Sequence, residues 1–419
     1  MFPRISRRAE PAHRVLIVIQ NLPLALDRRV RTECRALLDA GYGVSVICPK
    51  EHADEPDQHV LDGVVVHAYP TPPASSGLAS YVREFIMCWA HTARRSWQVA
   101  RAEGFDALQA CNPPDTYWLL GLLWKMRGKP FVYDQHDLSP EVYQARFARR
   151  GLLHRALLLL ERLTYRVADH VICPNPSYQE IALERGALPV ASTSVVMSSP
   201  DATTMRRGEP VPEYRMGHTH LACYVGIMGP QDGVDRLLEA VAHYVHVLDR
   251  RDTHFALLGF GDSLDELRQL SQRLRVTEWV TFTGPVDHTE LSRWLSTADL
   301  GVTPDPPSEF NHRSTMNKTL EYMAHEVPVV ATELRETRRC AGGAAEYVPD
   351  GDPALMAKTM AAVLDDPSRR AAMGTEGRHR IEHDFAWSEQ ARTYVAVYDH
   401  LLTTGTSTTR MPTTRGTAP

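Results

Sequence analysis

The chain has 419 residues, of which 43% are hydrophobic and 23% are charged, and its formal net charge is −5 at pH 7. These values exclude an intrinsically disordered protein and argue against bulk nucleic-acid binding, while the length is too great for one ordinary domain. The sequence therefore predicts a soluble protein of two globular domains with no nucleic-acid partner.

The cysteines and the N-terminus predict where the protein works. The cysteines form no Cys-x-x-Cys pair and mostly lie in apolar patterns, which is typical of reduced, buried thiols. Residues 1–14 lack the apolar core of a signal peptide, and no run of 18 apolar residues predicts a membrane-spanning helix. We therefore expect a cytoplasmic protein. The seven cysteines are Cys34, Cys48, Cys88, Cys111, Cys173, Cys223 and Cys340.

The first strand–helix–strand unit is predicted over residues 14–49. A β-branched run at 14–21 precedes Asp27, which can cap a helix that ends at Gly41. The connection between strand and helix lacks the Gly-x-Gly-x-x-Gly fingerprint, which disfavours a nicotinamide-dependent enzyme. Arg28 and Arg29 lie in the first helical turn, where the helix dipole opposes a cation. They indicate either a nearby phosphate or carboxylate, or a solvated pair beside Asp27.

Polar side chains follow the next predicted strands. After a long helix from Tyr81 to Glu103, the strands at 105–111 and 130–134 are followed by Asn112, by His136 and Asp137, and by Glu141. The carboxyl ends of parallel strands are where such sheets bind ligands. His136 is therefore either a catalytic residue or a loop histidine satisfied by its neighbours.

Residues 146–166 predict an amphipathic helix, with leucines on one face and arginines elsewhere. Such a helix either packs its leucines on the core or lies on an anionic membrane. The arginines are Arg146, Arg149, Arg150, Arg155, Arg162 and Arg166. A further helix at 178–185 and a strand at 192–198 complete the first half.

A second α/β half follows a polar stretch at 198–220 that is typical of a linker. Apolar strands alternate again with amphipathic helices, so the chain is predicted to contain two doubly wound parallel sheets. The strands are predicted at 221–229, 254–262, 280–284 and 299–305, and the helices at 234–245, 265–274 and 289–296.

Residues 311–332 predict a loop, a helix and a short buried strand. Met316, Leu320, Met323 and Val327 recur at helical spacing, and Ser314 or Thr315 can cap the helix. Asn317 and Lys318 lie in its first turn, where a cation is unfavourable unless an anion is bound. Lys318 and the free helix N–H groups could hold a phosphate while Glu321 binds a sugar hydroxyl, or Lys318 and Glu321 could form an exposed pair.

The segment NKTLEYMAHEVPVVAT resembles the donor-binding segment of retaining glycosyltransferases of family 4, which have the GT-B fold. The stretches FDALQACNPPDTYWLL, KPFVYDQHDLSPEVY and VGIMGPQDGVDRLLEA also match, and the similarity runs from about Arg14 to Leu402. The resemblance implies two Rossmann-like domains across a cleft. We expect an acceptor-side domain at 1–200, a linker at 201–220, a donor-binding domain at 221–386, a closing helix at 387–403 and a disordered tail at 404–419.

The resemblance also implies roles for particular residues. Glu321 is expected to bind the ribose of the donor, and His136 with Asp137 to face the transferred sugar and phosphate. The remaining expected donor contacts are Asn317, Lys318, Arg313, Gly226, Gly229 and Gly233, and the expected acceptor-side or phosphate contacts are Arg28, Arg29 and Asn112. Arg313 replaces the first glutamate of the family's Glu-x7-Glu motif, and Ile227 and Asp232 stand where an arginine and a lysine usually neutralise the diphosphate.

The expected activity is hexosyl transfer from a nucleotide diphosphate sugar to a hydroxyl acceptor, with retention and without a metal ion or other cofactor. The resemblance to enzymes of cell-surface polysaccharide assembly favours a lipid-linked acceptor and a peripheral contact with the inner membrane. The replacements at Arg313, Ile227 and Asp232 leave two alternatives. One is a catalytically weak nucleotide-sugar-binding partner of another enzyme, and the other is a GT-B-fold epimerase.

Overall fold

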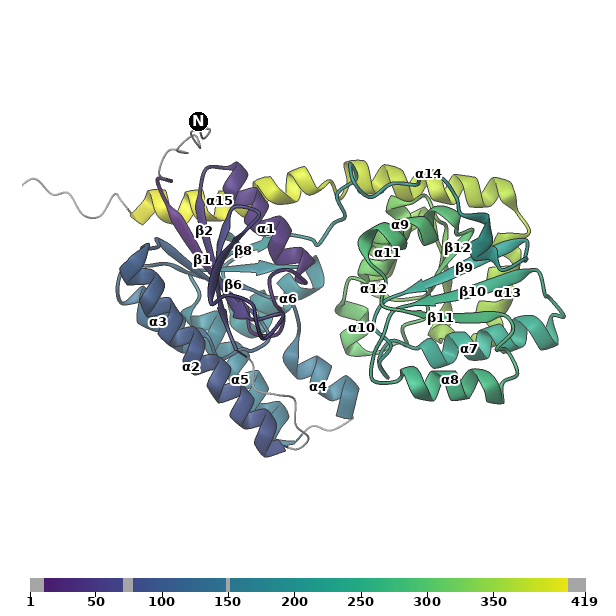
Figure 1. Ribbon diagram of the computed structural model, residues 1–419, viewed down its shortest axis with the longest axis horizontal. Coiled ribbons are helices and arrows are strands. Elements are labelled where there is room, and N and C mark those ends of the chain that lie inside the picture. Colours follow the sequence, from purple (N-terminus) through teal and green to yellow (C-terminus); the bar gives the residue numbers. More distant parts are fainter. Residues whose placement is uncertain (1–10, 71–77, 148–150, 406–419) are drawn as a thin grey trace, which may run out of the picture. The chain divides into compact units, whose positions relative to one another are not determined.

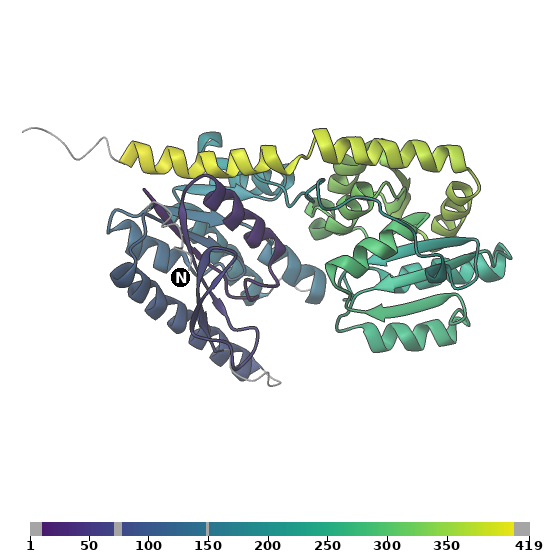
Figure 2. The ribbon, with the colours of Figure 1, turned by 45° about the horizontal axis from the view of Figure 1, so that its top comes forward.

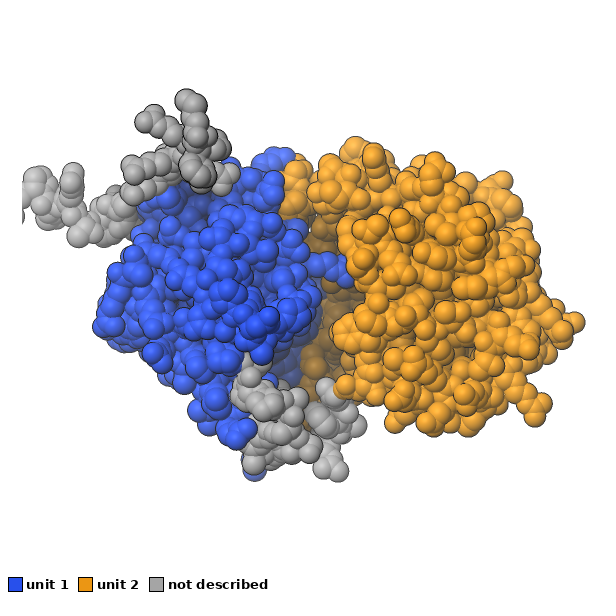
Figure 3. Space-filling view, viewed as in Figure 1, with its two compact units in different colours: residues 1–140, 151–196, 391–419 blue, residues 141–150, 197–390 orange. Residues whose placement is uncertain are grey.

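The computed structural model describes residues 11–70, 78–147 and 151–405, which form two compact units (Figure 3). Unit 1 comprises residues 1–140, 151–196 and 391–419, and unit 2 comprises residues 141–150 and 197–390. The division in the middle of the chain thus lies at Val196, near the expected boundary at residue 200. Each unit is an α/β sandwich (Figure 1).

Unit 1 contains an eight-stranded sheet in the order β3-β4-β2-β1-β5-β6-β7-β8, parallel except for the β3–β4 pair. The strands are β1 (Arg14–Val18), β2 (Gly43–Pro49), β3 (Gln58–Leu61), β4 (Val64–Tyr69), β5 (Ala107–Cys111), β6 (Phe131–Asp134), β7 (His170–Cys173) and β8 (Thr193–Val195). The helices of this half of the chain are α1 (Arg28–Asp39), α2 (Leu78–Ala102), α3 (Trp118–Lys125), α4 (Ser139–Phe147), α5 (Leu152–Val167) and α6 (Pro176–Gly186).

Central strands of unit 1 are apolar because helices cover both faces of the sheet. Val15, Leu16, Ile17 and Val18 of β1 are all fully buried, as continuous apolar runs in parallel sheets predict. The Asp27 carboxylate caps α1 by accepting a hydrogen bond of 3.0 Å from the Val30 N–H, which confirms the predicted helix start. All seven cysteines are buried and unpaired, as predicted.

Two features of unit 1 differ from the sequence prediction. The structure contains a β3–β4 hairpin that the sequence prediction did not include. Asp62 and Gly63 at its turn both have positive φ and form an Asp-Gly hairpin signal. The single amphipathic helix expected at 146–166 is wrong, because α4 ends at Phe147 and α5 begins at Leu152. Arg149 and Arg150 lie outside the described residues.

Unit 2 contains a six-stranded parallel sheet in the order β11-β10-β9-β12-β13-β14. In chain order this is 3-2-1-4-5-6, so the connections reverse direction between β9 and β12. The strands are β9 (His220–Val225), β10 (Thr253–Leu258), β11 (Val280–Gly284), β12 (Leu300–Thr303), β13 (Val329–Thr332) and β14 (Ala345–Val348). The helices are α7 (Val234–Ala242), α8 (Leu264–Arg273), α9 (His288–Thr297), α10 (Glu309–Arg313), α11 (Asn317–Ala324), α12 (Arg335–Ala341), α13 (Pro353–Leu364) and α14 (Pro367–His383).

The polar stretch before β9 is packed against unit 2. The Tyr214 ring stacks on Trp294 of α9 with 3.8 Å between centroids, and Arg215 forms an ion pair with Asp299. The Gly208 N–H donates to the Ser296 hydroxyl. Much of the segment expected as a linker is thus anchored to the second unit.

The last described helix, α15 (Trp387–Gly405), is shared by the units (Figure 2, yellow). Its residues up to Gln390 belong to unit 2, and those from Ala391 belong to unit 1. Within unit 1, the Tyr42 hydroxyl donates a 2.5 Å hydrogen bond to Asp399. Residues 406–419 of the expected disordered tail lie outside the described residues. Among the described helices, none is both long enough and apolar enough to cross a membrane.

Two glycine turns meet at the carboxyl ends of β9 and β10. The Gly226 N–H donates to the Leu258 carbonyl at 3.0 Å, and a Cβ added at Gly259 would lie 1.8 Å from the Gly226 oxygen. Gly259 also has a φ of +147°, which only glycine adopts readily. Glycine is therefore required at 259 by both contact and conformation.

We predict that Gly259→Ala lowers the free energy of unfolding by about 2–5 kcal/mol, since a backbone oxygen cannot move aside as a flexible side chain can. Gly128→Ala is the matched control, because Gly128 also has positive φ but nothing lies within 4 Å of the place that a Cβ would take. The control is expected to cost about 1–2 kcal/mol. Urea denaturation measures both, and equal losses would contradict the contact at Gly259.

Candidate functional site

In unit 1, Asn112 organises the loop that follows β6. Its side-chain oxygen accepts from the backbone N–H groups of His136 at 2.6 Å and Asp137 at 3.1 Å. Its Nδ2 donates to the Asp137 carbonyl at 2.7 Å and to the Asp115 carboxylate at 3.0 Å. Asn112, expected as an acceptor-side or phosphate contact, is buried and fixes the backbone of the His136–Asp137 loop.

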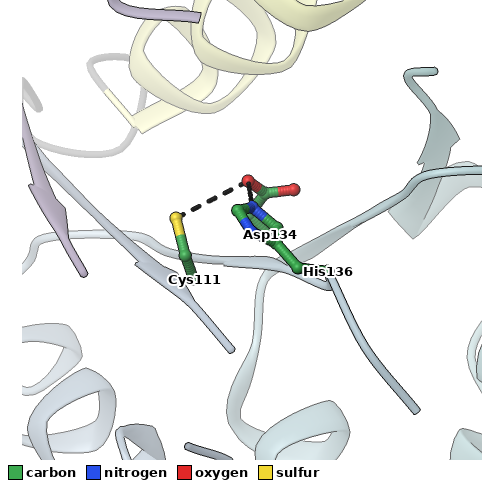
Figure 4. A group of neighbouring side chains, drawn as sticks. All are labelled: Cys111, Asp134 and His136. Carbon is green, nitrogen blue, oxygen red and sulfur yellow. Dashed lines mark hydrogen bonds and ion pairs between the residues drawn. The ribbon is translucent and has the colours of Figure 1, made fainter. Parts of the chain in front are cut away.

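The His136 imidazole points to Asp134 (Figure 4). Its Nε2 lies 2.6 Å from the Asp134 Oδ2, and 15% of the histidine side chain remains exposed. Burial alone would lower the pKa of His136, but the charge of Asp134 and the hydrogen bond to it outweigh burial and raise it. Asp134 accepts the hydrogen bond from Nε2–H. When the ring is charged, the second ring nitrogen, Nδ1, also carries a proton and can donate it to a ligand in a hydrogen bond.

Arg29 of α1 binds the Asp134 carboxylate of the His136–Asp134 pair. Its Nη2 donates to Asp134 Oδ1 at 2.8 Å, its Nε lies 3.0 Å from Glu33, and its Nη1 donates to the Val196 carbonyl at 2.8 Å. The charges of Arg29 and His136 outweigh burial and hold the pKa of Asp134 below its usual range. Of the alternatives that the sequence left open for Arg29, the structure shows a nearby carboxylate, and that carboxylate is internal. Arg28 is exposed.

A second buried acid, Glu33, lies beside Asp134 and Arg29. Burial and the charge of Asp134 raise the pKa of Glu33 to about 8, despite the opposing charge of Arg29. Gln109 donates through Nε2 to Glu33 at 2.9 Å and to Asp134 at 3.2 Å. Glu33 is therefore harder to ionise than an exposed glutamate, although Arg29 and Gln109 both direct N–H donors to it.

Cys111, Asp134 and His136 gather closely enough to raise the question of a metal ion (Figure 4). The Cys111 sulfur lies 3.6 Å from Asp134 Oδ2, and burial raises the thiol pKa well above its usual value. The 2.6 Å between His136 Nε2 and Asp134 Oδ2 is a hydrogen-bond distance, and Arg29 occupies the other oxygen of Asp134. This arrangement is a hydrogen-bonded ion pair with Arg29 beside it.

Asp137, expected beside the transferred sugar, forms its hydrogen bonds with Asn112 through its backbone. Both its N–H and its carbonyl bind Asn112. Burial raises the pKa of the Asp137 carboxyl, and the charge of His136 opposes this rise.

In unit 2, the predicted glycines form the turn at the switch point between β9 and β12. Gly226 packs against the aliphatic part of Lys318, since a Cβ there would lie 3.2 Å from the lysine Cε. Gly233, with a φ of +69°, precedes α7, and a Cβ added to it would clash with the Pro304 carbonyl at 2.3 Å. The Gly229 N–H donates to Asp232 at 2.9 Å.

Lys318 is buried and paired with an acid of its own unit. Its Nζ donates to both carboxylate oxygens of Asp305, at 2.8 and 3.0 Å, and lies 5.0 Å from the centroid of the Tyr224 ring. Asp305, which is 1% exposed, follows β12 and is not among the site residues predicted from the sequence. The exposed pair with Glu321 is therefore wrong for Lys318, and the anion that the sequence offered as the alternative is present as the Asp305 side chain.

Asp232 adds a second acid near this lysine. Burial raises its pKa to about 6, with a further contribution from the charge of Asp305 and an opposing one from Lys318. The Asp232 carboxylate occupies the Gly229 N–H, so an internal anion lies at the turn where the family resemblance implies the donor diphosphate.

The start of α11 differs from the prediction. Met316 is the N-cap residue and provides no side-chain cap, while the Ser314 hydroxyl donates to the Phe310 carbonyl. The expected capping by Ser314 is therefore wrong, because the unpredicted helix α10 ends there. Asn317 is exposed at the helix start, and Glu321 is buried one turn along.

Arg313 lines a cavity of about 510 Å³ beyond the carboxyl ends of β12, β13 and β14. Its guanidinium lies 3.5 Å from Glu309, one turn earlier on α10. Both arginines and carboxylates line the cavity, which suits a polar ligand. Its lining residues are Glu309, His312, Arg313, Glu333, Leu334, Arg335, Arg338, Pro349 and Asp350.

Two family models match the chain, one in each half. The model described as a glycosyl transferase 4-like domain matches residues 25–197, and the model described as glycosyl transferases group 1 matches residues 219–366. The chain is 25% identical over 398 residues to a glycogen synthase of Mycobacterium tuberculosis, covering 89% of this chain and 90% of the relative. It is 28% identical over 428 residues to D-inositol 3-phosphate glycosyltransferase 1 of Catenulispora acidiphila, covering 94% and 97%.

Solved structures share the fold at low sequence identity. Sucrose-phosphate synthase from Thermosynechococcus elongatus aligns with a TM-score of 0.76 and 20% identity, over 94% of this chain and 100% of that chain. The Anabaena protein Alr3699/HepE in complex with UDP-glucose aligns with a TM-score of 0.68 and 16% identity, over 93% and 100%.

The raised pKa of Glu33 predicts a pH dependence of stability. The folded state holds this proton up to about pH 8, whereas the unfolded state releases it above about pH 4.5. Wild-type stability should therefore fall as the pH rises between these values, by at most about 1.4 kcal/mol per pH unit. Glu33→Gln should remove this contribution and gain stability relative to wild type as the pH rises.

Denaturant unfolding at pH 5, 6, 7 and 8 measures the difference between variant and wild type. Asp39→Asn on the same helix is the control, because Asp39 is exposed and pairs with Arg35 at the surface. A Glu33→Gln difference that stays constant with pH would show that Glu33 ionises normally.

Proposed function

Because this chain belongs to the glycosyltransferases of family 4 type with the GT-B fold, we propose that it transfers a hexose, with retention of configuration, from a nucleotide diphosphate sugar to a hydroxyl acceptor. The observation that carries the donor assignment is the site of Lys318. This buried cation lies at the switch point of a sheet ordered 3-2-1-4-5-6, beside two glycine turns. Such a switch point is where doubly wound sheets bind nucleotides.

The donor diphosphate would exchange places with internal anions. Its oxygens would take the Lys318 ammonium from Asp305 and the Gly229 N–H from Asp232, and they would approach the N-terminus of α11, which has no side-chain cap. Glu321, on the same helix, would accept hydrogen bonds from the ribose hydroxyls. Stabilising the leaving diphosphate is the main electrostatic demand of the reaction, and these groups supply it.

His136 would assist at the reacting sugar as a hydrogen-bond donor. Its Nε2 proton is committed to Asp134, so a charged ring presents Nδ1–H to a sugar or phosphate oxygen. A ring held in this form is poorly suited to act as a base. We assign no covalent nucleophile, and nothing among the described residues of either unit specifically favours the epimerase or the catalytically weak partner.

We predict that Lys318→Ala weakens donor binding by about tenfold or more, because it removes a charge-assisted contact to phosphate. Asp232→Asn should act in the opposite direction, since it removes a negative charge from the phosphate site, and its advantage should grow as the pH rises above 6. Calorimetric titration of a nucleotide-sugar panel from pH 5.5 to 8 measures both effects. Unchanged donor affinity in Lys318→Ala would overturn the donor assignment.

For the acceptor side, we propose a lipid-linked substrate reached at the surface of the inner membrane from the cytoplasm. The N-terminal half of α5 supports this proposal, because Leu152 is 85% exposed, and Leu153 and Leu159 are more than half exposed. Arg155 and Arg162 of the same helix are exposed as well. Apolar side chains flanked by cations are the composition that binds an anionic bilayer surface.

The paired change Leu152→Ser and Leu153→Ser should reduce co-sedimentation with anionic vesicles several-fold, because both leucines would insert among the acyl chains. Leu355→Ser is the matched control, since Leu355 is an exposed leucine of α13 in unit 2. Wild-type binding should also weaken at high salt and with neutral vesicles. Binding that ignores lipid charge, or that survives the paired change, would contradict membrane docking through α5.

A further inference from the structure

Gln109 of β5 connects the C-terminal helix α15 to the pair formed by Asp134 and His136. Its side-chain oxygen accepts hydrogen bonds from the hydroxyls of Tyr394, at 2.6 Å, and Tyr398. Its amide nitrogen donates to Glu33 at 2.9 Å and to Asp134 at 3.2 Å. Gln109 and these four partners are fully buried, so no solvent competes for these bonds.

The two tyrosines decide which way the Gln109 amide faces. Burial raises the pKa of Tyr394 and Tyr398 well above the usual value, so both remain hydroxyl donors across the physiological range. In the structure both hydroxyls donate to the amide oxygen, and the NH₂ group then faces the two acids. The opposite orientation would place the amide oxygen against the ionised Asp134, which has no proton to donate, and would withdraw the donor that Asp134 receives.

We propose that Tyr394 and Tyr398 are positioning residues for His136, acting through Gln109 and Asp134. When α15 is docked on unit 1, Gln109 holds the Asp134 carboxylate where it binds the imidazole. When the hydroxyls are absent, Gln109 satisfies its oxygen by rotating, withdraws its donor from Asp134 and loosens the ion pair. The importance of this coupling for catalysis rests on the proposed function of His136 in sugar transfer.

The charge of His136 depends on groups from several elements. Asp134 of β6 faces its Nε2, Arg29 and Glu33 of α1 lie on the far side of that carboxylate, and Cys111 of β5 adjoins it. Asp27, before α1, and the adjacent Asp137 also act on the ring electrostatically. Of these groups, Asp134 and Glu33 receive hydrogen bonds from Gln109, so the tyrosines act on His136 chiefly through Asp134.

The test compares the wild-type chain with the Tyr394→Phe, Tyr398→Phe double variant. Its first readout is the His136 pKa, measured by NMR titration with ¹⁵N-labelled histidine and assigned with His136→Gln. A loosened ion pair predicts a lower His136 pKa in the double variant, because Asp134 then stabilises the imidazolium less. The second readout is turnover, where kcat is expected to fall about tenfold while donor KM changes less than about twofold.

Tyr42→Phe is the matched control. It also removes a hydrogen bond between α15 and the rest of unit 1, that of Tyr42 with Asp399, but it leaves Gln109 untouched. This variant should retain the wild-type His136 pKa and kcat even if it lowers the melting temperature. A purely structural role of α15 would instead make the control and the double variant behave alike.

The outcomes separate this inference from the proposed function. An unchanged His136 pKa in the folded double variant would overturn the coupling, and the single Tyr394→Phe variant applies the same test if the double variant does not fold. A lowered pKa with unchanged kcat would support the coupling and overturn the role of His136 in transfer. A lowered pKa with reduced kcat supports both.

Discussion

Asp134 in unit 1 and Asp305 in unit 2 are carboxylates buried at the carboxyl ends of parallel strands, and burial of such a charge costs several kcal/mol unless it is paired. Arg29 and His136 pair with Asp134, whereas Lys318 pairs with Asp305. In both units, therefore, the cations nearest the expected chemistry are held by the protein's own buried acids. The fold fixes the positions of these cations before a substrate arrives. Lys318 would still have to exchange Asp305 for the donor diphosphate.

Pairing with a buried acid affects His136 in unit 1 and Lys318 in unit 2 differently. His136 keeps a charged hydrogen-bond donor because Asp134 holds one ring nitrogen and leaves the other for a ligand. Lys318 has to be shared, since the donor diphosphate and Asp305 are both anions, and Asp232 occupies a backbone donor of the same glycine turn. A neutral Asp232 repels the donor diphosphate less than an ionised Asp232 does. Because its pKa is about 6, donor binding is coupled to pH in the neutral range.

The sequence predicted the features that depend on local pattern. Alternation of apolar strands and amphipathic helices predicted both sheets, and Asp27 predicted the start of α1. Features that depend on distant partners were not predicted, because the pairing of Arg29 with Asp134 joins residues 105 positions apart. The helix dipole argument raised an anion near Arg29 and near Lys318 as one of two alternatives, and the sequence alone did not distinguish a bound phosphate from Asp134 and Asp305. Ser314 failed as a cap because α10 ends at Arg313.

The resemblance to family 4 supplied what local pattern lacked, namely the expected roles of His136 at the transferred sugar and of Glu321 at the ribose. The departures from that family at Arg313, Ile227 and Asp232 change the charge at the donor site rather than its framework, since the glycine turns and the buried lysine remain. We therefore propose an active transferase whose donor site carries less positive charge than the family resemblance implies.

The central claim is that this donor site supports turnover and not binding alone. Phosphorus NMR of the purified wild-type protein with a panel of nucleotide diphosphate sugars measures this directly, because free nucleoside diphosphate is distinct from the donor. We expect release of nucleoside diphosphate from at least one donor, by slow hydrolysis without an acceptor and faster with one. Saturable donor binding with no release of nucleoside diphosphate, under either condition, would contradict it and identify the chain as a nucleotide-sugar-binding partner.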